Sequence, residues 1–265
     1  MKPGNQSGAP DPVPIPAGGF LKDKRSAQEA SSFWEGAFFS AGEEGKMRID
    51  RREVTRYLGL KGGRELDVRW AERVEEVVAE AEELLTPAFS WRTYPVVQVG
   101  EGEITLAGTD LTVSGPRMVR RLAGAEHLTA LAVTCGPALE EAAAVAFARG
   151  EYARGAILDA AGSAAAEALA DEVNDSVAAE ARARGYCLLP RVSPGYADWD
   201  LAVQPRLLKA AGAEGLGISL SAALLLIPRK SVTAVIAWMK APVAVNGGCR
   251  ACPRTSCRYR REEEQ

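Results

Sequence analysis

An alanine-rich stretch between residues 138 and 184 occupies the middle of the chain. Because alanine has the highest helix propensity, this stretch predicts helices over about 138–149 and 156–184, with breaks at Gly150 and Gly155. A further helix is expected over about 67–85, where valine, alanine and leucine recur at the spacing of one helical face. Any fold of this chain must therefore accommodate long helices.

Strand-like sequence alternates irregularly with these helices. Val96–Val99 and Ile104–Leu106 flank residues 100–103, a Gly-Glu-Gly-Glu turn that predicts a hairpin. Further strands are expected at 128–135, at 216–227 (continuous or interrupted) and at 232–239, with short helices near 49–59 and 201–211. Helices and strands are mixed without strict alternation, which favours an α+β fold: one domain with a twisted, largely antiparallel sheet flanked by helices.

Composition divides the chain into three parts. Residues 1–32 are rich in proline and glycine and cannot bury enough apolar surface to offset the entropy of ordering, so they predict a flexible tail. Residues 33–241 are expected to hold the domain, with its folded part beginning near Ile49. Residues 242–265 form a tail rich in cysteine and arginine.

Charge and residue usage exclude several classes of function. The net charge is −3 and the pI is near 5.5, which argues against nucleic-acid binding through phosphate contacts. No apolar run approaches the roughly 20 residues that span a bilayer and no signal segment is evident, so we expect a cytoplasmic protein without a membrane partner. His127 is the only histidine, which rules out a two-histidine zinc site and makes a structural role for it the better interpretation.

Residues 191–204 read RVSPGYADWDLAVQ and carry the best candidate for a binding site. Pro194-Gly195 predicts a type II turn, in which glycine supplies a positive φ and leaves the backbone open to a ligand. Arg191 offers a planar pair of donors suited to a carboxylate, and Tyr196 adds an amphipathic ring. These residues could together bind an amino-acid-like ligand, although the spacing alone favours a plain surface turn with a structural arginine and tyrosine.

This segment closely resembles the R-x-x-P-G-Y segment of the reactivation domain of cobalamin-dependent methionine synthase, above all its stand-alone versions. LAVTCG at 131–136, the helix containing Ser163–Asp171 and IPRKSVTAVI at 227–236 add to the resemblance, which covers about residues 49–239. It implies S-adenosylmethionine binding, and the family's ligand-contacting positions fall here on Glu167, Arg191, Ser193, Gly195 and Tyr196. From helical geometry alone, Glu167 is equally a solvated glutamate.

The resemblance also implies a function. The chain would be the reactivation subunit of methionine synthase, supporting reductive methylation of cob(II)alamin to methylcobalamin on a partner chain. It would be an accessory component of the methyltransferase, which need not be active alone. The corrinoid-binding D-x-H-x-x-G motif is absent around His127, so the cobalamin would be held by the partner. A flavodoxin- or ferredoxin-like protein would donate the electron.

Three cysteines near the C-terminus suggest a second kind of chemistry. Cys249, Cys252 and Cys257 form a C-x-x-C-x4-C pattern that suits an iron–sulfur cluster or zinc, while dithiol redox chemistry and a metal-free tail remain alternatives. Two other functions stay open on this evidence. One is an iron–sulfur redox activator of another corrinoid methyltransferase, and the other is a non-catalytic module that docks on a corrinoid protein.

Overall fold

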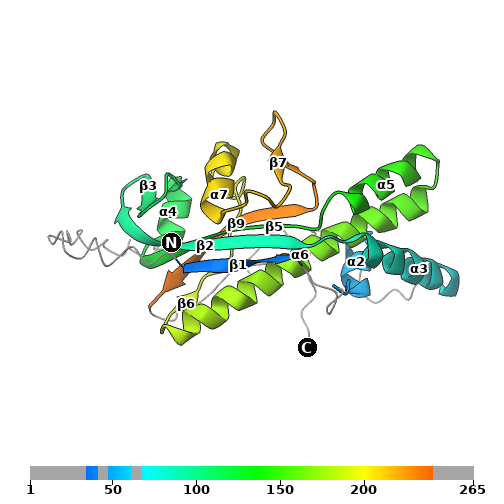
Figure 1. Ribbon diagram of the computed structural model, residues 1–265, viewed down its shortest axis with the longest axis horizontal. Helices are drawn as coiled ribbons and strands as arrows, with labels where there is room; N and C mark the ends of the chain where they lie inside the picture. Colours follow the sequence, from blue (N-terminus) through cyan, green and yellow to red (C-terminus); the bar gives the residue numbers. More distant parts are fainter. Residues whose placement is uncertain (1–33, 41–46, 61–66, 241–265) are drawn as a thin grey trace, which may run out of the picture. The chain divides into compact units, whose positions relative to one another are not determined.

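The computed structural model describes residues 34–40, 47–60 and 67–240 (Figure 1). Its helices are α2 (Arg51–Tyr57), α3 (Val68–Leu84), α4 (Pro116–Leu122), α5 (Ala138–Ala148), α6 (Tyr152–Ala183) and α7 (Gln204–Ala211), with the 3-10 turn η1 (Leu201–Val203) before α7. Its strands are β1 (Trp34–Ser40), β2 (Ala88–Val99), β3 (Glu103–Leu106), β4 (Thr112–Ser114), β5 (Ala125–Thr134), β6 (Cys187–Leu188), β7 (Ser219–Leu220), β8 (Leu226–Ile227) and β9 (Ser231–Met239).

The main sheet is antiparallel throughout its described pairs, with the strand order β4-β3-β2-β5-β9-β6 and β1 paired with β2. Its centre is formed by β2, β5 and β9, where Leu131 lies between Trp91 and Ala234. The expected α+β fold with a largely antiparallel sheet flanked by helices is therefore confirmed.

The two faces of the sheet pack against different helices, because successive side chains of a strand point to opposite sides. Leu131 and Val133 of β5 join Leu169 and other residues of α6 in one core cluster. Ala130 and Ala132 belong to a second cluster with α4 and α7. Figure 1 accordingly shows α6 along one side of the sheet and α7 along the other.

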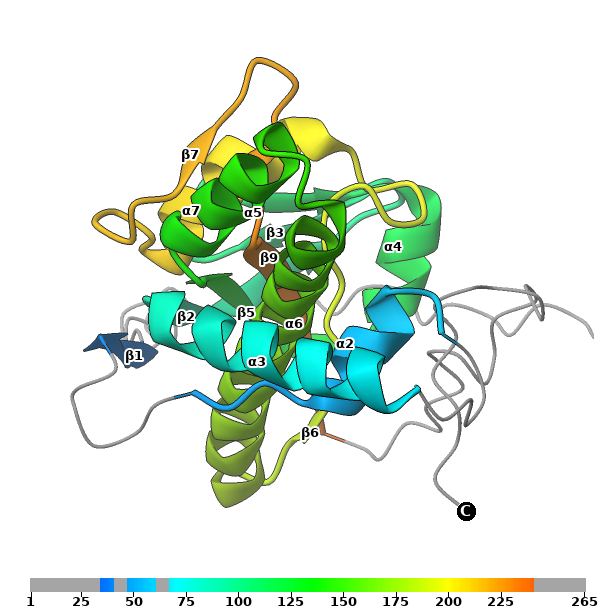
Figure 2. The ribbon, with the colours of Figure 1, turned by 90° about the vertical axis from the view of Figure 1, so that its right-hand side faces the viewer.

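The first half of α6 forms a third core cluster with α2, α3 and α5, and Figure 2 shows α2 and α3 lying against α6. Small residues permit this close packing. A β-carbon on Gly155 would lie 2.9 Å from the ring of Phe147 on α5. The prediction of a helix break at Gly155 is therefore wrong: this glycine lies inside α6 and makes room for α5, whereas Gly150 separates the two helices with a φ of 77°.

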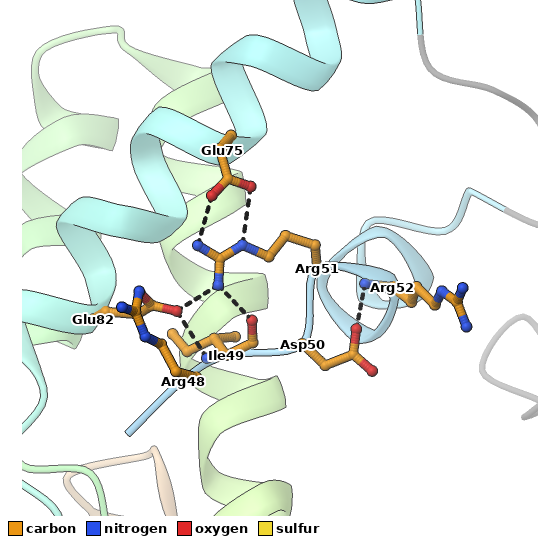
Figure 3. Close-up of polar contacts among 7 residues, drawn as sticks. All are labelled: Arg48, Ile49, Asp50, Arg51, Arg52, Glu75 and Glu82. Atoms are coloured by element: carbon orange, nitrogen blue, oxygen red, sulfur yellow. Dashed lines mark hydrogen bonds and ion pairs between the residues drawn. The ribbon is translucent and has the colours of Figure 1, made fainter. Parts of the chain in front are cut away.

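A buried carboxylate joins the segment before α2 to α3 (Figure 3). Glu82 is only 7% exposed and accepts hydrogen bonds from the backbone N–H of Ile49 at 2.9 Å, from Arg48 at 3.1 Å and from Arg51. Arg51 also donates two hydrogen bonds to Glu75, at 2.7 and 3.0 Å. The donors around Glu82 satisfy a charge that would be costly to bury alone, and they fix where α2 begins.

Two sequence expectations about strands are wrong. Strand β1 pairs with β2 ahead of Ile49, so the fold begins earlier than the hydrophobic pattern indicates. Residues 216–227 do not form one strand, continuous or interrupted, because β7 and β8 run antiparallel and pair with each other. The left-handed backbone conformations of Gly217 and Leu224, with φ of 72° and 59°, are incompatible with continuous extended structure there.

Other expectations have different outcomes. The hairpin of β2 and β3 and the strands β5 and β9 lie where the sequence predicted them. His127 packs edge-on against Tyr186, with ring centroids 5.3 Å apart, as expected of a structural histidine. The predicted tails at 1–32 and 242–265 lie outside the described residues and stay predictions. No helix among the described residues is long and apolar enough to cross a membrane.

Candidate functional site

The Pro194-Gly195 bend has the geometry that its sequence predicts. The backbone N–H of Tyr196 donates to the carbonyl of Ser193 at 3.3 Å, which closes a four-residue turn with proline and glycine at its centre. Gly195 has a φ of 87°, near the value that a type II turn requires at that position. The type II turn is therefore confirmed.

The bend is exposed at Gly195 and Tyr196 but is flanked by buried residues. Gly195 is exposed and the Tyr196 residue is 69% exposed, whereas Pro194 is buried. Trp199, which is 1% exposed, anchors the far side of the bend in the core with α4 and α7. Its carbonyl accepts a hydrogen bond from the N–H of Gly195 at 2.8 Å. A ligand can thus reach the backbone of Gly195 and the side chain of Tyr196, while the buried Trp199 holds the bend in place.

A second attachment joins the bend to α4. Asp198 accepts hydrogen bonds from the backbone N–H groups of Arg117 at 2.7 Å and Met118 at 3.1 Å, at the start of that helix. These two N–H groups, that of Arg117 above all, hold the pKa of Asp198 below its usual range. Sequence reasoning placed Asp198 in the motif but gave it no role, because its partners lie about 80 residues earlier in the chain.

Arg191 reaches α6 because of its place on the sheet edge. Leu188 pairs with Trp238, and Val192 forms an isolated bridge with Val235. Between these two pairings the edge segment uses four residues, whereas β9 uses three. This is the geometry of a bulge. Val192 belongs to the cluster on the α7 side. Its neighbour Arg191 therefore points to the opposite side, where α6 lies.

Arg191 joins two carboxylates of α6. Its Nη2 lies 2.7 Å from Oε2 of Glu167, and its Nη1 lies 2.5 Å from Oδ1 of Asp171. The arginine side chain is 18% exposed, against 38% for Glu167 and 48% for Asp171. Burial lowers the pKa of Arg191, but the two carboxylates outweigh it and raise the pKa, so the guanidinium stays charged.

The structure thus brings together two of the residues that the sequence singled out, Glu167 and Arg191. It also adds Asp171, which sequence reasoning named only as the end of a matching helix. The available signal was spacing: Glu167 and Asp171 are four residues apart, so they share one face of a helix. Ser193 contributes its backbone carbonyl to the turn and is half-buried.

Helix α2 lies close to Glu167. Burial raises the pKa of Tyr57, and the negative charge of Glu167 adds to the rise against the opposing effect of Arg56. The guanidinium carbon of Arg56 lies 4.3 Å from the centre of the Tyr57 ring. Three parts of the chain therefore meet around Glu167: the end of α2, the middle of α6 and the segment that carries the bend.

The structure does not test the predicted metal site. Cys249, Cys252 and Cys257 lie outside the described residues. Within the ranges that are described, no group of three or more histidine, cysteine, aspartate or glutamate side chains could hold a metal ion. A cavity of about 430 Å³ lies at the β2–β3 hairpin and β4, and none of its lining residues is a predicted site residue.

Comparison with known proteins shows a similarity at the level of the fold. No family model matches this chain, and no curated protein matches it. Among solved structures, the chain is similar to the MetH reactivation domain, whose crystal structure was determined bound to AdoHcy. The alignment has a TM-score of 0.58 and 17% sequence identity, and covers 80% of this chain and 79% of the other. The chain therefore shares the fold of that reactivation domain.

Proposed function

We propose that this chain binds S-adenosylmethionine at the Pro194-Gly195 bend and serves as the reactivation subunit of a cobalamin-dependent methionine synthase. The observation that carries the proposal is the ion pair between Arg191 and Glu167, because Arg191 lies three residues before Pro194 of an exposed type II turn. The similar fold of the MetH reactivation domain, solved with AdoHcy, supports a ligand of this class.

The residues present fit this ligand. S-adenosylmethionine carries a carboxylate, an ammonium and a sulfonium, and the site offers a guanidinium, two carboxylates and exposed turn backbone. Arg191 can bind the ligand carboxylate, because its ion pairs with Glu167 and Asp171 use only two of its five N–H groups. Glu167 can pair with the ammonium or the ribose hydroxyls. The exposed ring of Tyr196 offers a face and a hydroxyl donor.

The work of this chain would be positioning. Bound S-adenosylmethionine supplies a methyl group, and a flavodoxin- or ferredoxin-like donor supplies one electron. The partner's cob(II)alamin would then become methylcobalamin, leaving S-adenosylhomocysteine. Arg191, Glu167 and the turn would hold the ligand with its methyl group towards the partner's corrin. No side chain need act as a general acid or base, because the step transfers no proton.

A reconstitution tests the proposal. The chain is mixed with a cobalamin-loaded methionine synthase that lacks its own reactivation domain, together with S-adenosylmethionine and a reductant. We expect the cob(II)alamin absorption to give way to that of methylcobalamin, and the Arg191→Ala variant to lose at least about 90% of the rate. Arg206→Ala removes an exposed arginine from α7 and should leave the rate unchanged. Conversion at the same rate without the chain would refute the proposal.

The iron–sulfur alternative depends on the predicted cluster at Cys249, Cys252 and Cys257, which also stays a proposal. Anaerobic reconstitution with iron and sulfide, followed by absorption spectroscopy, would show whether the tail takes up a cluster. Replacing the three cysteines by serine should abolish that uptake and leave S-adenosylmethionine binding intact, because the candidate binding site uses none of them.

A further inference from the structure

The bend that carries Gly195 and Tyr196 contains one residue whose backbone conformation is unfavourable by itself. Ala197 has a φ of 54°, which is uncommon for a residue with a β-carbon, whereas the φ of 87° at Gly195 costs a glycine little. Such conformations persist only where the surrounding structure holds them. Trp199 holds one end of the bend: its side chain is buried in the core, and its backbone exchanges hydrogen bonds with Gly195 and Tyr196.

Asp198 supplies the other attachment. Its two carboxylate oxygens accept hydrogen bonds from Arg117 and Met118, so both oxygens are engaged at the start of α4. The opposite surface is shaped to receive it. A β-carbon at Gly115 would lie 2.7 Å from the carboxylate carbon and from the backbone oxygen of Asp198. The hydrogen bonds and the glycine are independent observations of one close contact.

We propose that Asp198 is a positioning residue for ligand binding: by fastening the bend to α4, it holds Gly195 and Tyr196 in the conformation that receives S-adenosylmethionine. The inference rests on the proposed function and adds to it a residue that does not touch the ligand. It also gives α4, which contacts β3 and β4 at one edge of the sheet, a role in supporting the binding site.

Two variants break the contact from its two sides. Asp198→Ala removes both acceptors, and Gly115→Ala leaves Asp198 in place but inserts a β-carbon where it packs. If the contact between Asp198 and Gly115 supports ligand binding, each single variant binds S-adenosylmethionine more weakly than the wild type. The double variant then binds no more weakly than the single variant with the lower affinity. Asp200→Ala is the matched control: it removes the same charge two residues away, where the carboxylate's hydrogen-bond donor among the described residues is the N–H of Ala202, within its own turn.

Hydrogen exchange gives a measurement that needs no ligand. We expect amides of residues 195–199 to exchange at least about fivefold faster in Asp198→Ala than in the wild type, with β5 and β9 unchanged. Calorimetry should show S-adenosylmethionine binding about tenfold more weakly in Asp198→Ala and in Gly115→Ala, and unchanged in Asp200→Ala.

Each outcome is decisive. Faster exchange with weaker binding, in the Asp198→Ala and Gly115→Ala variants alone, supports the inference. Unchanged exchange in Asp198→Ala overturns it, as does faster exchange with unaltered affinity. Additive losses in the double variant also overturn it, since the two residues would then act separately. A wild-type chain that does not bind S-adenosylmethionine refutes the proposed function and this inference together, whereas normal wild-type binding with an indifferent Asp198→Ala refutes the inference alone.

Discussion

The Arg191 guanidinium lies 2.7 Å from the Glu167 carboxylate, although 24 residues separate them in the sequence. One comes from the edge of the sheet and the other from the middle of α6, so their meeting depends on how the helix crosses the sheet. Asp171 completes the arrangement at the second guanidinium nitrogen. A charged arginine is thereby held in one orientation in the segment that leads into the bend.

Removing either carboxylate should weaken ligand binding. Glu167→Gln and Asp171→Asn each replace an ion pair with the guanidinium by a hydrogen bond to an uncharged amide, and we expect each to raise the dissociation constant for S-adenosylmethionine about tenfold, or about 1.4 kcal/mol. Calorimetric titration measures this. Asp175→Asn removes an exposed carboxylate one turn further along α6 and should change nothing. Equal losses in all three variants would mean that only the overall charge of α6 matters.

The positive φ of Gly195 gives a test of the turn itself. A β-carbon there meets Leu201 at an ordinary 3.5 Å, so Gly195→Ala introduces backbone strain of about 1–2 kcal/mol without a clash. We expect thermal unfolding a few degrees lower and at least tenfold weaker S-adenosylmethionine binding. Gly185→Ala adds comparable strain at a φ of 79°, where a β-carbon meets nothing within 4 Å. It should lose stability similarly and keep full affinity; a parallel loss of affinity in both variants would contradict a specific role for the bend.

Tyr196 should contribute to ligand binding but little to stability, whereas Trp199 should contribute strongly to the stability of the fold. Tyr196→Ala changes an exposed side chain and should leave the unfolding midpoint within about 1 °C while weakening S-adenosylmethionine binding. Trp199→Ala removes a buried side chain and should cost about 3–5 kcal/mol of unfolding free energy. Chemical denaturation and calorimetry on both variants make the comparison. Destabilisation by Tyr196→Ala, with unchanged affinity, would show that the tyrosine is structural.

Glu82 predicts how stability depends on pH. Burial raises its pKa, but the hydrogen bonds from Ile49 and Arg51 outweigh that effect and hold the pKa below its usual value of 4.5. The carboxylate therefore stabilises the fold above about pH 4.5, and this contribution is lost as the pH falls through the lowered, folded-state pKa. Unfolding midpoints between pH 3 and pH 7 should fall less steeply with acid in Glu82→Gln, from a lower starting point at pH 7. Parallel curves for the two proteins would contradict the assignment.

Much of the fold follows from sequence because it depends on local signals. The alanines of α6, the hairpin at 100–103 and the apolar strands β5 and β9 each determine their own structure. What sequence could not provide depends on distant partners. Gly155 looks like a helix break until Phe147 is placed against it. Leu224 reads as strand because apolar composition does not reveal a left-handed backbone.

The site divides in the same way. The type II turn at Pro194-Gly195 is a local property, and the sequence predicts it correctly. Glu167 came from resemblance rather than from geometry, and its contact with Arg191 became visible only with the crossing of α6 and the sheet edge. Asp198 escaped notice because its partners on α4 are remote in sequence. A side chain that connects two distant elements cannot be recognised from the local sequence around it, because its partners lie elsewhere in the chain.

Direct titration of S-adenosylmethionine into the wild-type chain and the Arg191→Ala variant tests the central claim most directly. We predict saturable binding of one ligand per chain in the wild type and at least a hundredfold weaker binding in Arg191→Ala, since the variant also leaves Glu167 and Asp171 without their shared arginine. The absence of binding to the wild type, or equal affinity in the two proteins, would contradict the account.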